Sequence, residues 1–72
     1  MKMTKFKVMR LKACMTQTEL AEKAGVSWST IARIEQTPST IYNMKFQNVA
    51  GIAKAMGVTT EDMYNWGKEE EV

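Results

Sequence analysis

The sequence predicts an all-α fold: a compact domain of five helices. Apolar residues recur at intervals of three and four along most of the chain, which is the spacing of one helical face. Residues that favour helix starts precede several of these runs, and glycines that favour helix ends follow three of them, at Gly25, Gly57 and Gly67. The 72 residues include one proline and four glycines, which leaves room for helices and argues against a strand-rich fold.

The first predicted helix runs from about Lys5 to Ala13. Phe6, Met9 and Ala13 fall at i, i+3 and i+7 and form one apolar stripe. Arg10 lies beside this stripe, which makes it a candidate for a specific pairing. The residues before this helix are expected to be irregular.

A second helix is predicted after Thr16. Thr16 is a favourable N-cap, and Glu19, three residues later, completes a capping box. Gly25 ends this helix, because glycine adopts the left-handed conformation without a steric penalty from Cβ. Two helices of this length cannot fold alone, so we expect the other segments to support this helix and the one that follows.

The third helix has Ser27 as its predicted N-cap, and Ile31 and Ile34 form its buried face. Trp28 is out of phase with both isoleucines. Most tryptophans lie in a core or an interface, but this phase favours an exposed position on the outward side of the helix, together with Arg33.

Residues 37–44 are predicted to form a loop, because Pro38 donates no backbone hydrogen bond and its serine and threonine neighbours compete for local ones. A fourth helix follows from Lys45 to Met56 and ends at Gly57. Its apolar stripe, at three- and four-residue spacing, consists of Phe46, Val49, Ile52, Ala53 and Met56.

A short fifth helix is capped by Thr59 or Thr60, and its Met63 and Trp66 are expected to face the core. The predicted domain spans residues 1–67. Residues 68–72 are expected to be an acidic, disordered tail, because they have nothing to bury.

The composition excludes several kinds of site. The chain has one cysteine, Cys14, and no histidine, so it can form neither an internal disulfide nor a Cys/His zinc site. We interpret Cys14 as a structural thiol and not a reactive one. No nucleophile–base pair, metal cluster or phosphate loop occurs, so we expect no enzyme activity, no metal and no cofactor. No segment is long and apolar enough to be a membrane span or a signal peptide, which predicts a cytoplasmic protein without membrane contact.

The charge is unevenly distributed. Five of the ten basic residues precede the first acid, and three of the eight acids lie in the last four positions. Residues 1–68 carry ten basic and five acidic side chains, a net charge of +5. This favours a polyanionic partner modestly. A solvated surface with an acidic tail explains the same count equally well.

Many positions match a known pattern: Arg10, Thr16-Gln17, Glu19-Leu20-Ala21, Lys23-Ala24-Gly25-Val26-Ser27, Thr30-Ile31, Arg33-Ile34-Glu35 and Ile52-Ala53-Lys54-Ala55-Met56-Gly57-Val58. On these residues, the segment 6–66 resembles the helix–turn–helix family of phage repressors and Cro proteins, also called the XRE family. The resemblance places the helix–turn–helix unit at residues 17–36. It implies a lambda-repressor-like domain whose third helix enters the major groove of double-stranded DNA, as a homodimer on a palindromic operator. The implied function is a sequence-specific transcriptional regulator, which we expect to be a repressor.

The resemblance also assigns contacts. Trp28, Ser29 and Arg33 match positions that face base edges. Arg33 is the best candidate to read a base, because a guanidinium donates twice to guanine O6 and N7. Trp28 can pack on a thymine methyl group or on the sugar–phosphate wall. The candidate contacts to the DNA backbone are Gln17, Ser27, Thr30, Gln36, Thr37, Asn43 and Lys45.

Two positions depart from the family pattern, and one pair has two interpretations. Thr37 stands where the family usually has glycine, and Cys14 stands where the family often has glycine. Arg10 can contact a phosphate or pair with Glu35 and so tie the first helix to the third. The resemblance favours the pair.

The remaining apolar residues of the loop, Ile41, Tyr42 and Met44, are our candidates for the dimer contact. They can instead fold back on the core. An alternative function is the antitoxin of a toxin–antitoxin pair, in which the same domain binds a protein partner and its own promoter. The exposed loop residues and the acidic tail would then contact that partner.

Overall fold

The computed structural model describes residues 3–68, and no strand occurs in that range, which confirms the predicted all-α class. The elements are α1 Lys5–Lys12, α2 Gln17–Ala24, α3 Trp28–Gln36, the 3₁₀ helix η1 Pro38–Asn43, α4 Phe46–Met56 and α5 Thr60–Gly67. None of these helices has the length and apolar character needed to cross a membrane. Of the predicted acidic tail, residues 69–72 lie outside the described range.

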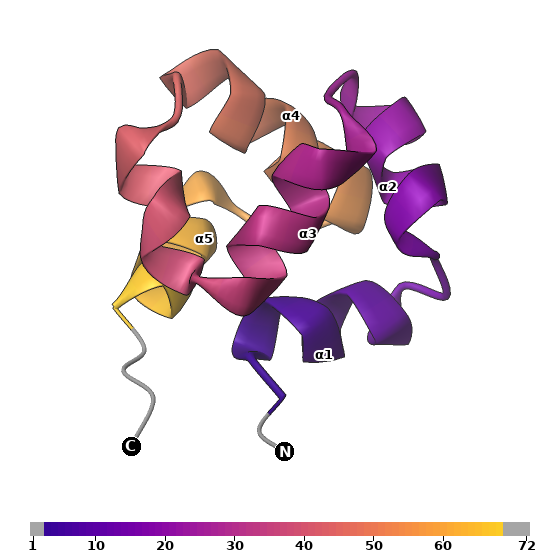
Figure 1. Ribbon diagram of the computed structural model, residues 1–72, viewed down its shortest axis with the longest axis horizontal. Coiled ribbons are helices and arrows are strands. Elements are labelled where there is room, and N and C mark those ends of the chain that lie inside the picture. Colours follow the sequence, from indigo (N-terminus) through magenta and orange to yellow (C-terminus); the bar gives the residue numbers. More distant parts are fainter. Residues whose placement is uncertain (1–2, 69–72) are drawn as a thin grey trace.

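The helices surround α3. Figure 1 shows α3 in the middle of the molecule, with α1 below it, α2 to its right, and η1 and α5 to its left. Contacts between α2 and α4 and between α5 and η1 close the structure around one core. The core side chains are Phe6, Leu20, Ala21, Ile31, Ile34, Ile41, Val49, Ile52, Ala53, Met56 and Met63.

The predicted core positions of α5 are confirmed. Met63 is buried, and Trp66 packs edge to face against Phe6 with their ring centroids 6.5 Å apart. This aromatic pair joins the last helix to the first. Its geometry is one that the ring quadrupoles favour.

The helix ends follow the sequence signals closely. Both threonine caps form a complete capping box, Thr16 with Glu19 and Thr59 with Asp62. The fifth helix is thus capped by Thr59, the first of the two candidates. Gly25, at the end of α2, has a φ of +75°, in the left-handed region that glycine adopts at least cost.

Helix α1 begins at Lys5, as predicted, and ends at Lys12, one residue before the predicted end. Thr4 is buried and caps the helix by accepting a hydrogen bond from the Lys7 backbone N–H at 3.2 Å, so the chain is regular from this point. At the other end, Ala13 is the C-cap and Cys14 has a φ of +59°. This left-handed conformation explains why glycine is usual there, since a Cβ atom is strained in it.

The prediction of a loop over residues 37–44 was wrong. Residues Pro38–Asn43 form η1, with Pro38 in its first position, where the missing N–H leaves no hydrogen bond unmade. Ile41 is 2% exposed and belongs to the core. The backbone of Thr37 lies in an ordinary region, with a φ of −137°, so the glycine of the family pattern is not needed there.

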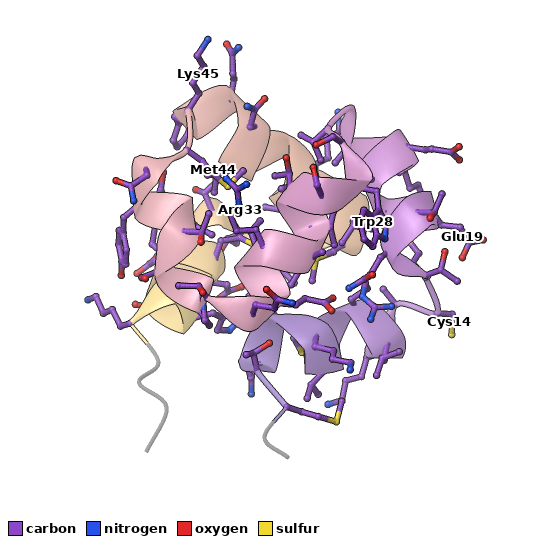
Figure 2. All side chains as sticks on the ribbon, in the orientation of Figure 1. Cys14, Glu19, Trp28, Arg33, Met44 and Lys45 are labelled. Atoms are coloured by element: carbon purple, nitrogen blue, oxygen red, sulfur yellow. The ribbon has the colours of Figure 1, made fainter. Side chains whose placement is uncertain are left out.

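Phe46 was also predicted wrongly. It continues the apolar stripe of α4 in sequence, yet it is 64% exposed. The stripe depends only on helical spacing, whereas burial also needs a facing element. Phe46 is the first residue of α4, and Figure 2 shows the preceding Lys45 at the outer edge of the molecule.

Candidate nucleic-acid interface

The α2–turn–α3 unit is held together at close range. Ala21 is buried, and its carbonyl oxygen accepts a hydrogen bond from the Val26 N–H at 3.0 Å, which fixes the turn at Gly25. At the start of α2 the backbone N–H of Thr16 donates to the Glu19 carboxylate at 2.8 Å. This bond, assisted by the Thr16 hydroxyl, lowers the pKa of Glu19 from its usual value.

The outward face of α3 consists of exposed polar residues. Ser29, Arg33 and Gln36 are spaced i, i+4 and i+7, and all three are exposed. Ile31 and Ile34, on the opposite side, are buried in the core, so the helix cannot turn this face away from solvent. The helix therefore presents a fixed polar surface.

Arg33 lies on one side of this face. Figure 2 shows it in the middle of the view, directed toward the η1 side of α3. Within residues 3–68 its guanidinium has no ion-pair partner, so its five N–H donors are available to a ligand.

Three hydroxyl groups lie together at the start of α3. The Ser27 Oγ atom is 3.1 Å from the Ser29 Oγ atom and 2.9 Å from the Thr30 Oγ1 atom. Ser27 is the N-cap residue of α3, as predicted, with an extended backbone, but its side chain makes no capping hydrogen bond. The Thr30 N–H donates to the Ser27 carbonyl oxygen at 3.1 Å, so no cap by the hydroxyl is needed.

Arg10 and Glu35 form an ion pair between α1 and α3. The Arg10 Nε atom lies 2.5 Å from the Glu35 Oε2 atom, and both side chains are less than a tenth exposed. The Arg10 Nη1 atom also donates to the Met15 carbonyl oxygen at 2.7 Å. Of the two interpretations of Arg10, the structure has the pair with Glu35.

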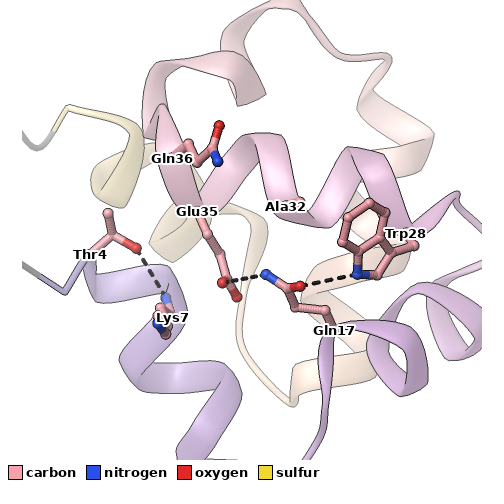
Figure 3. A pocket seen from close by; sticks show the side chains of 7 residues that line it. All are labelled: Thr4, Lys7, Gln17, Trp28, Ala32, Glu35 and Gln36. Atoms are coloured by element: carbon pink, nitrogen blue, oxygen red, sulfur yellow. Dashed lines mark hydrogen bonds between the residues drawn. The ribbon is translucent and has the colours of Figure 1, made fainter.

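Gln17 extends this pair to the surface. Its Nε2 atom donates to the Glu35 Oε1 atom at 2.8 Å, and its Oε1 atom accepts from the Trp28 Nε1–H at 3.0 Å (Figure 3). A carboxylate only accepts and an indole N–H only donates, so both neighbours impose the same orientation on the amide. Side chains from α1, α2 and α3 are thus linked in the order Arg10, Glu35, Gln17, Trp28, which we call the hydrogen-bond chain.

An open hollow of about 390 Å³ lies beside this chain, between the first turn of α1 and one edge of α3. Figure 3 shows Gln17 at its base, reaching between Glu35 and Trp28. The hollow is lined by Thr4, Lys7, Gln17, Trp28, Ala32, Glu35 and Gln36.

A family model for the Cro/C1-type helix–turn–helix (HTH) DNA-binding domain matches residues 5–69. The chain belongs to this family. The match covers nearly the whole chain and includes every element described above. No curated protein and no solved structure matched the chain. As a Cro/C1-type HTH domain, the chain has a DNA-binding fold.

The predicted contact residues of this HTH domain have different surroundings. Trp28, at 54%, is exposed as its phase predicts. Among the predicted backbone contacts, Thr30 is partly buried and Gln17 is engaged in the hydrogen-bond chain. The other predicted backbone contacts are all exposed: Ser27, Gln36, Thr37, Asn43 and Lys45.

One predicted dimer contact needs correction. Ile41 is buried within the core, so its side chain offers no surface to a second HTH domain; it folds back, as the alternative interpretation held. Tyr42 is about half exposed and donates from its hydroxyl to the Tyr64 carbonyl oxygen at 2.7 Å. Met44 is partly buried against the core.

The sequence analysis missed the bond between Gln17 and Trp28. Eleven positions separate the two residues, and neither helical spacing nor capping rules connect them. Only the crossing of α2 and α3 brings them together. In the described range, no three His, Cys, Asp or Glu side chains form a group suited to a metal ion.

Proposed function

We propose that this chain is a sequence-specific transcriptional repressor that binds a palindromic operator as a homodimer, with α3 in the major groove. The observation that carries the proposal is the outward face of α3, where Ser29, Arg33 and Gln36 are exposed on a helix fixed by its buried isoleucines. An α-helix fits the width of the major groove, and base edges there carry a distinct pattern of donors and acceptors.

Arg33 is the principal base-reading residue in this proposal. Its guanidinium is exposed and unpaired within residues 3–68, so no internal bond must break before it binds DNA. A guanidinium donates twice to guanine O6 and N7, which discriminates against other bases by about 1–3 kcal/mol. Ser29, which can bond to several bases, contributes less discrimination.

The remaining polar residues around α3 are assigned to the DNA backbone. Ser27, Thr30, Gln36 and Thr37 carry hydroxyl or amide groups that can donate to phosphate oxygens. Asn43 and Lys45 extend this surface past η1, and the charge of +5 over residues 1–68 adds long-range attraction. Gln17 keeps one amide hydrogen outside the hydrogen-bond chain for the same purpose.

The dimer contact is assigned to the exposed ring of Tyr42 and the neighbouring Met44. A two-fold pair of domains would place two α3 helices about one turn of DNA apart, which requires a palindromic site. The antitoxin alternative used the same apolar loop residues for its partner contact, so the buried Ile41 is removed from both assignments.

The test begins with a selection of bound sequences from a random DNA pool. We expect one palindromic operator, two chains per duplex in sedimentation, and an affinity that falls steeply with salt concentration as counterions are released. A reporter gene with this operator in its promoter should be expressed less when the protein is present. Equal affinity for the selected operator and for random DNA would overturn the proposal.

Arg33→Ala is the sharpest variant. It should relax the preference at one base pair of each half-site by about 5- to 150-fold while leaving the other positions unchanged. Lys54→Ala is the matched control, since it removes the same charge from the exposed surface of α4, away from the proposed contacts. Preserved base preference in Arg33→Ala would remove this residue from the recognition surface.

A further inference from the structure

Trp28 has used its only hydrogen-bonding group inside the protein. The indole Nε1–H is the sole polar group of a tryptophan side chain, and here it donates to Gln17 at 3.0 Å. Yet 54% of the residue is exposed. The exposed part of the ring is therefore hydrocarbon, which can neither donate nor accept a hydrogen bond.

The ring is also held in one orientation. Turning the indole over would break its bond to Gln17, and turning the Gln17 amide over would break the bonds to both Trp28 and Glu35. Glu35 is in turn fixed by the buried Arg10. The exposed carbon edge is thus positioned through contacts that reach the interior of the domain.

Ala32 extends this apolar surface. It lies one helical turn after Trp28, and both residues line the hollow beside the hydrogen-bond chain. The indole ring and the Ala32 methyl group form the apolar part of the hollow, whose other lining residues are polar: Thr4, Lys7, Gln17, Glu35 and Gln36. Arg33, the proposed base-reading residue, lies on the other side of the α3 face (Figure 2).

We propose that Trp28 and Ala32 read the 5-methyl group of a pyrimidine, and that 5-methylcytosine satisfies this contact as thymine does. The inference rests on the proposed docking of α3 in the major groove. The C5-methyl group of thymine is the apolar group that unmodified base pairs present there. The carbon atoms of the indole ring and the Ala32 methyl group can contact this methyl group, and they make no hydrogen bond to the base. Methylation of a cytosine at this position therefore strengthens binding.

The test uses the selected operator in synthetic duplexes. Each thymine of the half-site is replaced in turn by uracil, which removes one methyl group and leaves every hydrogen-bonding group in place. Replacement at one position should weaken binding by about three- to tenfold, the effect of burying one methyl group. At the same position, a 5-methylcytosine–guanine pair should bind more tightly than a cytosine–guanine pair by a similar factor.

Two variants connect the effect to the ring. Trp28→Ala should bind thymine and uracil duplexes equally, whereas Trp28→Phe, which keeps an aromatic carbon surface, should retain the difference. Because Trp28 is exposed, both variants should remain folded, which circular dichroism checks.

Two kinds of failure are distinguishable. If the operator is bound specifically but no uracil replacement weakens binding, Trp28 packs on the sugar–phosphate wall, and the methyl-reading inference is overturned while the proposed function stands. The same holds if Trp28→Ala keeps the full difference between thymine and uracil. If the parent protein does not prefer the operator to random DNA, the proposed function and this inference both fail.

Discussion

At the scale of single residues, Arg10 connects the stability of the fold to the proposed DNA-binding surface. Three of its nitrogen atoms donate hydrogen bonds, two of them to Glu35 and one to the Met15 carbonyl oxygen. Its charge is buried and fully paired, and the Glu35 carboxylate that it holds also orients Gln17. A charge in this environment is costly to leave without its partner.

Arg10→Ala should destabilise the domain by about 3 kcal/mol, because Glu35 would keep a buried charge without compensation. For a domain of this size that is a large part of the total stability, which is typically about 4–11 kcal/mol. Urea denaturation measures the loss. Lys12→Ala, an exposed change of the same charge on the same helix, should stay within about 0.5 kcal/mol of the parent. Equal midpoints for Arg10→Ala and the parent would contradict the role of the pair.

Which residues of the site were predictable depends on what determines their position. The exposure of Trp28 follows from its helical phase relative to Ile31 and Ile34, so the sequence alone is sufficient to predict it. Its bond to Gln17 depends on how α2 crosses α3, which no local rule specifies. The same reason explains why Ile41 was assigned to a surface, since its burial depends on the path of η1 against α5.

At the scale of the elements, local signals predicted the helices well where a cap decides the boundary. The capping boxes at Thr16 and Thr59 and the turn at Gly25 each satisfy backbone groups within a few residues, so the sequence contains the whole interaction. Residues 37–44 show the limit. Pro38 and its polar neighbours are equally compatible with a loop and with a short 3₁₀ helix, and packing selects the helix.

The capping box of α2 should make stability depend on pH. Bonds from Thr16 lower the pKa of Glu19 in the folded chain. The contribution of the ionised carboxylate to the free energy of unfolding is therefore complete above the usual glutamate pKa of about 4.5, and it is lost as the pH falls through the lowered pKa. NMR titration of the Glu19 carboxyl should give a midpoint below 4.5. Glu19→Gln keeps an acceptor for the Thr16 N–H but does not titrate, so its stability should fall less steeply in acid. A Glu19 midpoint at or above 4.5 would contradict this account.

At the scale of the whole molecule, the fit of α5 against η1 closes the fold. A Cβ atom at Gly67 would lie 2.9 Å from two side-chain carbons of Ile41 and 3.0 Å from Tyr42 Cε2. Ile41 is buried and has little room to move. The absence of a side chain at Gly67 therefore lets the last helix dock close to η1, which in turn continues from the end of α3.

Gly67→Ala should destabilise the domain by about 1–3 kcal/mol through overpacking, even though alanine is the better helix former. Thermal unfolding measures this change. Asn65→Ala is the matched control, because it places alanine at an exposed position of the same helix and should shift stability by no more than about 0.5 kcal/mol. A Gly67→Ala domain as stable as the parent would show that α5 and η1 can separate without cost.

The hydrogen-bond chain has a consequence for redesigning specificity. A new side chain at position 28 alone would leave the Gln17 amide oxygen without its donor, and replacing only the exposed residues of α3 would leave Gln17, which orients the first of them, unchanged. The side chains at positions 17 and 28 therefore depend on each other. A mutant library meant to change the proposed DNA specificity of this domain should vary both positions together.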